Sequence, residues 1–79
     1  MDKPDRIVCE PSILGGKPTV KGTRISVELI LGWLAAGWTF DDLLQSYPNI
    51  VREDILAALA YAAAVVHEGG YLPMTEIAA

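Results

Sequence analysis

Three basic residues near the start of the chain are its first candidates for chemistry. Lys17, Lys21 and Arg24 are half of the six lysines and arginines, and all three lie within the segment 15–27. Ammonium and guanidinium groups bind carboxylates and phosphates, and arginine can do so through two parallel hydrogen bonds. We therefore predict that this segment contacts a protein partner or nucleic acid. The alternative is a solvated basic face, or one that pairs with acidic groups of another subunit.

The other reactive side chains do not form a catalytic or metal-binding motif. Gly16 and Lys17 suggest a phosphate-binding loop, but Pro18 stands where such a loop needs serine or threonine. His67 is the single histidine. Two carboxylate pairs stand at the starts of expected helices, where they complement the helix dipole: Asp41 with Asp42, and Glu53 with Asp54. We expect neither an enzyme nor a cofactor or metal site.

Length and cysteine content predict one small domain that no disulfide bond or zinc ion stabilises. The chain has 79 residues and one cysteine, Cys9, which excludes an intramolecular disulfide and a four-thiolate zinc site. Cys9 is predicted to be a buried strand residue. The charged first residues lead into no signal-peptide pattern, and no stretch is long enough to span a bilayer. A cytoplasmic protein is expected.

Hydrophobic content is high for so small a chain. Hydrophobic residues make up 52% of it, and the mean hydropathy is +0.33. A small domain leaves much of its surface in water, so part of this apolar surface should be covered by another chain. We therefore expect a homodimer.

Charge is divided unevenly along the sequence. Residues 1–26 carry five basic and three acidic groups, whereas residues 27–79 carry one basic group, Arg52, and seven acidic ones. The net charge of −4 argues against a protein that coats nucleic acid by bulk electrostatic attraction. The pattern predicts a basic N-terminal part joined to an acidic helical body.

Short extended segments should place the basic residues on a small hairpin. Residues 7–9 are one strand candidate, and β-branched side chains at 19–20 and 23–25 suit further short strands. Gly15, Gly16 and Gly22 permit the positive φ angles that tight turns need. The segment 15–27 is predicted to form a β-hairpin or a pair of arched strands.

Two helices should follow, each with a recognisable start. Ser26 is a candidate N-cap for a helix over 27–36, which Gly37 would end in a left-handed conformation. Thr39 begins a second helix over 40–46, and the aspartate three residues later makes a near capping box. The proline at position 48 then forces a turn.

The third helix is expected to be the longest. It should run over 52–68 and stop at Gly69 and Gly70, with His67 favourably placed near its C-terminal end. Its start is less clear, because Val51 cannot cap a helix through its side chain; the start is either frayed or capped by Asn49. Apolar residues cover most of its circumference, so it should lie centrally or against its copy in a second subunit.

The order of these motifs resembles the small prokaryotic family called domain of unknown function 433, from about residue 7 to residue 61. The residues that carry the resemblance are Pro11, Ile13, Gly15 to Pro18, Lys21 to Ile25, Val27, Gly37, Thr39, Tyr47 and Pro48. The resemblance implies a mainly α, three-helix, homeodomain-like (helix-turn-helix) domain with a small N-terminal β-hairpin. We accordingly divide the chain into a flexible tail (1–6), one domain (7–70) and a C-terminal tail (71–79).

The same resemblance implies an antitoxin-like function of the VapB type. Such a protein binds and neutralises a PIN-type nuclease toxin by covering its acidic metal site or RNA channel, and Lys17, Lys21 or Arg24 would neutralise toxin carboxylates. A DNA-binding autoregulator is the first alternative, although Glu53 and Asp54 at the start of the third helix are poor groove residues. A structural homodimer with neither activity is the second.

Overall fold

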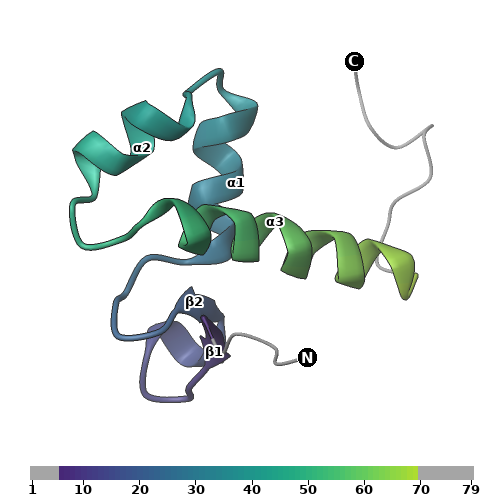
Figure 1. Ribbon diagram of the computed structural model, residues 1–79. Coiled ribbons are helices and arrows are strands. Elements are labelled where there is room, and N and C mark those ends of the chain that lie inside the picture. Colours follow the sequence, from purple (N-terminus) through teal and green to yellow (C-terminus); the bar gives the residue numbers. More distant parts are fainter. Residues whose placement is uncertain (1–5, 70–79) are drawn as a thin grey trace.

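Three helices and a small hairpin make up the part of the chain that the computed structural model describes, residues 6–69 (Figure 1). The predicted tails, 1–6 and 71–79, lie outside these residues except for Arg6. The fold is mainly helical, as predicted. In chain order the elements are strand β1 (Ile7–Cys9), the short 3₁₀ turn η1 (Leu14–Gly16), strand β2 (Pro18–Val20), and helices α1 (Val27–Ala35), α2 (Phe40–Ser46) and α3 (Arg52–His67).

The hairpin pairs β1 with β2 in an antiparallel register. Val8 lies opposite Thr19 at the centre of the pairing. The predicted strand at residues 23–25 does not form, so the hairpin is not contained within the segment 15–27. Instead Thr23 makes a turn: its hydroxyl donates to the Val20 carbonyl at 2.9 Å and accepts from the Ile25 N–H at 2.9 Å. A local side-chain bond of this kind competes successfully with strand pairing.

Cys9 is exposed, and the prediction that it is buried was wrong. It is the last residue of β1 and lies opposite Pro18. A sheet of two strands covers little beyond its own centre, where Thr19 and Val20 are buried, and the end of β1 therefore remains in contact with solvent.

Helices α1 and α2 begin and end as the sequence predicts. The Ser26 hydroxyl accepts the Leu29 N–H at 2.9 Å, and Gly37 follows α1 with a φ of 101°. At the start of α2, the Thr39 hydroxyl accepts the Asp42 N–H at 3.1 Å, while the Asp42 carboxylate accepts the Thr39 N–H at 2.8 Å. Both caps satisfy N–H groups that have no partner inside the helix.

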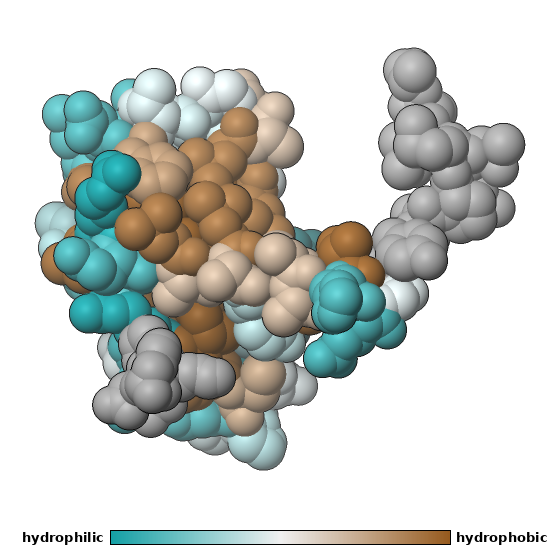
Figure 2. Space-filling model, turned by 45° about the vertical axis from the view of Figure 1, so that its right-hand side comes forward, coloured by the Kyte–Doolittle hydropathy of each residue, from teal (hydrophilic) through white to brown (hydrophobic). Residues whose placement is uncertain are grey.

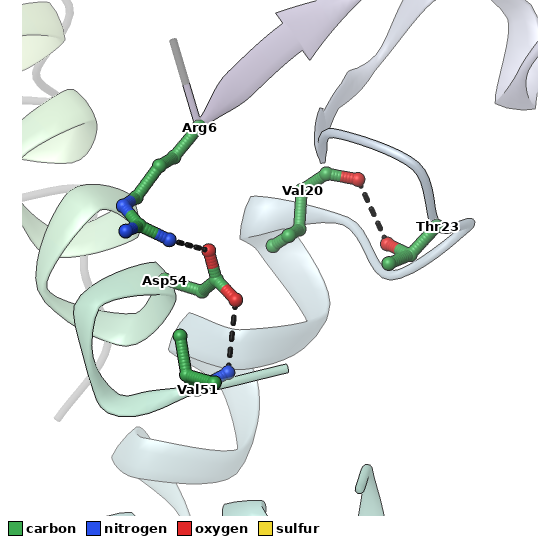
Figure 3. Close-up of polar contacts among 5 residues, drawn as sticks. All are labelled: Arg6, Val20, Thr23, Val51 and Asp54. Atoms are coloured by element: carbon green, nitrogen blue, oxygen red, sulfur yellow. Dashed lines mark hydrogen bonds and ion pairs between the residues drawn. The ribbon is translucent and has the colours of Figure 1, made fainter. Parts of the chain in front are cut away.

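Helix α3 starts differently from the prediction. Asn49 does not cap it, and its start is not frayed. The Asp54 carboxylate accepts the Val51 N–H at 2.9 Å through one oxygen and binds the Arg6 guanidinium at 3.0 Å through the other (Figure 3). The Asp54 carboxylate, inside the first turn, therefore replaces the missing side-chain cap and also links α3 to the residue that precedes β1.

The core lies where all three helices and the hairpin meet. α3 contributes its buried core residues from its first half and Tyr61 packs against them, while the last turns of α3 project beyond the body of the domain (Figure 1). The core therefore buries fewer of the apolar residues of α3 than the sequence pattern predicted. Its buried hydrophobic residues are Val20, Ile25, Val27, Ile30, Leu43, Ile50, Ile55 and Ala58.

Candidate partner-binding surface

Large apolar side chains are exposed on the projecting half of α3. The exposed fraction is 37% for Leu59, 42% for Val65 and 49% for Val66. Figure 2 shows hydrophobic side chains across the body and again near the tip of α3, next to hydrophilic ones. Isolated apolar side chains are common on protein surfaces, but several on one helical segment are typical of an interaction site.

A groove runs between this half of α3 and α1. Its volume is about 360 Å³, and almost all of its lining is apolar. Leu31 lines it from α1, Val65 lines it from α3, and the start of β2 completes the wall. The further lining residues are Lys17, Pro18, Ser26, Val27, Glu28, Tyr61, Ala62 and Val66. An open apolar groove of this size suits the side chains of a protein segment better than a polar small molecule.

Lys17 is the basic residue that lies at the groove. Its Nζ is 3.4 Å from Oε1 of Glu28, and the two side chains are 61% and 79% exposed. An ion pair this exposed contributes little stability, because water and salt screen it. Lys17 is therefore free to exchange Glu28 for a carboxylate of a partner.

Lys21 and Arg24 lie elsewhere, on the turn between β2 and α1. Both are exposed, and neither lines the groove. Within residues 6–69 neither side chain takes part in a recorded ion pair or hydrogen bond. The structure therefore separates Lys17 at the groove from Lys21 and Arg24 on the turn. For Arg24, a contact with a partner stays a prediction, while Thr23 supplies the local bonding of the turn.

The first turn of α3 offers little to a nucleic acid. The guanidinium of Arg52 stacks over the ring of Phe40, 4.9 Å from its centroid. Asp54 is buried, and its carboxylate is engaged by Arg6 and Val51. Glu53, which is exposed, places a negative charge where phosphate would approach.

Tyr61, at the groove, has an altered acidity that the sequence did not indicate. Burial raises the pKa of the Tyr61 phenol above its usual 10.0, and the neighbouring Cys9 thiol raises it further. Residues 9 and 61 are far apart in the chain, so no local pattern reveals their proximity. The groove itself was missed for the same reason, since its walls come from β2, α1 and α3.

The described residues present neither a metal-binding cluster nor a membrane-spanning helix. No group of three histidine, cysteine, aspartate or glutamate side chains there could hold a metal ion. Among the helices of residues 6–69, none is both long enough and apolar enough to cross a bilayer.

Comparison with known proteins places the chain in a family. The model of the family described as protein of unknown function (DUF433) matches residues 7–62. The uncharacterized protein y4eO of Sinorhizobium fredii is 38% identical over 58 residues, which are 73% of this chain and 26% of that protein.

A solved structure agrees with this match. The crystal structure of a DUF433 member protein from Anabaena variabilis superimposes with a TM-score of 0.76 at 28% identity, over 82% of this chain and 64% of that one. The chain thus spans about a quarter of the first relative and under two thirds of the second. The hairpin, the three helices and these matches together establish that the chain belongs to the DUF433 family.

Proposed function

We propose that this chain is an antitoxin-like protein of the VapB type, which binds and neutralises a PIN-type nuclease toxin through the groove between α1 and α3. One observation carries the proposal: an apolar groove on a projecting helix has an exposed lysine at its rim. Apolar lining provides affinity for a protein segment, and the lysine provides selectivity for an acidic partner. Binding is therefore the activity that we propose.

The positions of the charged groups suggest how the nuclease would be inhibited. A PIN-type nuclease holds its metal ions with carboxylates, and a partner seated in the groove would bring such carboxylates within reach of Lys17. The ammonium group would compete with the metal for them, and the body of the domain would block the RNA channel. Lys21 and Arg24, on the adjoining turn, would extend the basic contact.

The test requires a PIN-type nuclease as the partner, sought first in the gene adjacent to this chain, with RNA cleavage and complex formation as the two measurements. Val65→Glu places a charge in the groove and should abolish both binding and inhibition. Ala64→Glu makes the same change on an exposed neighbour that does not line the groove, and it should leave both intact. Equal effects of the two substitutions would contradict the proposal, as would the absence of binding by the wild-type chain.

A DNA-binding autoregulator is the second candidate, because α2, a turn and α3 follow one another in the order of a helix-turn-helix. This second candidate function presumes that the three helices are arranged as in a homeodomain. The residues at the start of α3 oppose it, since Arg52 is stacked on Phe40 and Glu53 is acidic. Lys21 and Arg24, on the turn between β2 and α1, would then make the contacts with DNA.

Salt dependence separates the two candidates. Phosphate contacts release counterions, so DNA binding through the basic residues should weaken steeply as salt rises. We expect no tight binding of the wild-type chain to its own promoter at any salt concentration, and a loss of nuclease binding when Lys17, Lys21 and Arg24 are all changed to alanine. Tight, salt-sensitive promoter binding that this triple variant loses would favour the autoregulator. A chain that binds neither ligand would favour a structural homodimer.

A further inference from the structure

A second apolar surface on α3 has the spacing of a coiled-coil seam. Leu56, Leu59, Ala63 and Val66 follow one another at intervals of three, four and three residues, and all four are exposed. Alternating steps of three and four place side chains along one line of a helix, which a partner helix can cover. α3 has 16 residues and is about 24 Å long, which is enough for two such repeats.

This seam, defined as Leu56, Leu59, Ala63 and Val66, borders the core-facing side of α3. Successive residues of a helix are turned by about 100°, so the centre of the seam lies roughly a quarter-turn from the mean direction of Ile55 and Ala58. Those two residues are fully buried, whereas Leu56 is 46% exposed. All four seam residues are exposed, so a second helix can reach them. Apart from Val66, which also borders the groove, the two apolar surfaces of α3 do not share residues.

We propose that the seam binds the seam of a second copy of this chain, with the two α3 helices antiparallel. In that orientation Leu56 lies in a layer with Val66 of the other copy, and Leu59 lies in a layer with Ala63. Large side chains then face smaller ones, and each contact occurs twice about a two-fold axis. The domain bodies, which flank the first half of each α3, come to lie at opposite ends of the helix pair.

Charge complementarity favours the antiparallel orientation. Glu53 and His67 flank the same side of the seam, one in the first turn of α3 and the other at its last residue. An antiparallel pair brings Glu53 of each copy beside His67 of the other. The two helix dipoles then point in opposite directions, which is electrostatically favourable. In a parallel pair the two copies of Glu53 would lie on opposite flanks of the seam, away from His67 of the other copy, and the dipoles would be aligned. The proposal does not rest on nuclease binding, and Val66 alone belongs to both the seam and the groove.

The first test compares two substitutions that differ only in position. Sedimentation equilibrium of the full chain, from about 1 µM to about 1 mM, should show a monomer–dimer equilibrium with a dissociation constant of about micromolar order, as suits a short interface. Ala63→Glu puts two charges into the seam and should weaken dimerisation by about a hundredfold or more. Ala64→Glu, one residue away and off the seam, should leave it unchanged. A monomer at every concentration, or equal effects of the two changes, would overturn the proposal.

The second test determines orientation. His67→Lys places a full positive charge beside Glu53 of the other copy in the antiparallel dimer, and it should tighten dimerisation roughly fivefold through two equivalent pairs. In a Glu53→Gln background the same change should give no gain. In a parallel dimer, position 67 of each copy lies far from Glu53 of the other, so His67→Lys would give no gain in either background, and this result would overturn the proposed orientation. Circular dichroism of each variant confirms that α3 remains folded.

Discussion

Asp54 shows how one side chain can hold two distant parts of the chain together. One carboxylate oxygen accepts the Val51 N–H and the other binds Arg6, 48 residues earlier (Figure 3). The Asp54 side chain is 10% exposed, while that of Arg6 is 39% exposed. A carboxylate buried to this degree needs both partners, because burial without them leaves its charge uncompensated.

Replacing Asp54 by alanine should therefore destabilise the domain. Loss of the helix cap and of the pair with Arg6 should together lower the free energy of unfolding by about 1–3 kcal/mol. Glu53→Ala is the matched control: Glu53 is the adjacent carboxylate in the same turn, but it is exposed, and its loss should change stability by less than about 0.5 kcal/mol. Urea unfolding followed by circular dichroism measures both. Similar losses for the two variants would show that the Asp54 contacts contribute nothing.

Tyr61 should make stability depend on pH in the alkaline range. Because burial raises the pKa of its phenol in the folded state, folding favours the protonated form. This contribution is fully present below the unfolded pKa of about 10 and is lost as pH rises through the folded value. The unfolding free energy of the wild-type chain should consequently fall more between about pH 8 and about pH 11 than that of Tyr61→Phe. Parallel pH profiles for the two proteins would contradict the assignment.

At the scale of the elements, two glycines near the end of α1 have opposite roles. Gly37 follows the helix with a φ of 101°, whereas Gly32 lies within α1 and is exposed. A Cβ added at either position meets no atom within 4 Å. Any effect of alanine at these positions must therefore come from backbone conformation and not from packing.

The same substitution should accordingly have opposite effects at the two sites. Gly37→Ala should lower the unfolding free energy by about 1 kcal/mol or more, because L-residues are strained at this φ. Gly32→Ala should raise it by about 0.5–1 kcal/mol, because alanine favours the helix and restricts the unfolded chain. Thermal unfolding of the two variants provides the measurement. A stabilising effect of Gly37→Ala would show that the cap does not need a left-handed residue.

Local chemistry explains which elements could be predicted from the sequence. The caps at Ser26 and Thr39 involve residues three apart, and the helices they start were predicted within a residue of their bounds. The partner strand of β2 and the ion pair of Arg6 with Asp54 link residues far apart, which a sequence pattern does not encode. At the candidate surface, Lys17 was singled out from the sequence by its charge, and its binding role stays a prediction. The groove that it borders forms only when α1 and α3 pack together.

At the scale of the whole molecule, stability should be divided along α3. Ile55 is fully buried, whereas Val65 is 42% exposed. Ile55→Ala should lower the unfolding free energy by about 2–5 kcal/mol, but Val65→Ala should lower it by less than about 1 kcal/mol. Hydrogen exchange should likewise show slow amides in the first half of α3 and faster ones in the second half at low protein concentration. Equal costs for the two substitutions would place the second half of α3 within the cooperative core.

The packing between α1 and α2 gives the protein a localised optical signal. Trp33 and Trp38, the two tryptophans of the chain, stack with ring centroids 3.9 Å apart and planes inclined by 26°, and the Trp33 indole N–H donates to the Tyr47 hydroxyl at 3.2 Å. Two indoles this close couple their intense far-ultraviolet transitions, so far-ultraviolet circular dichroism should show a paired exciton band. All indole emission therefore originates at this corner. A fluorescence titration reports on α1 and α2, and detecting events along α3 requires a dye on the exposed thiol of Cys9.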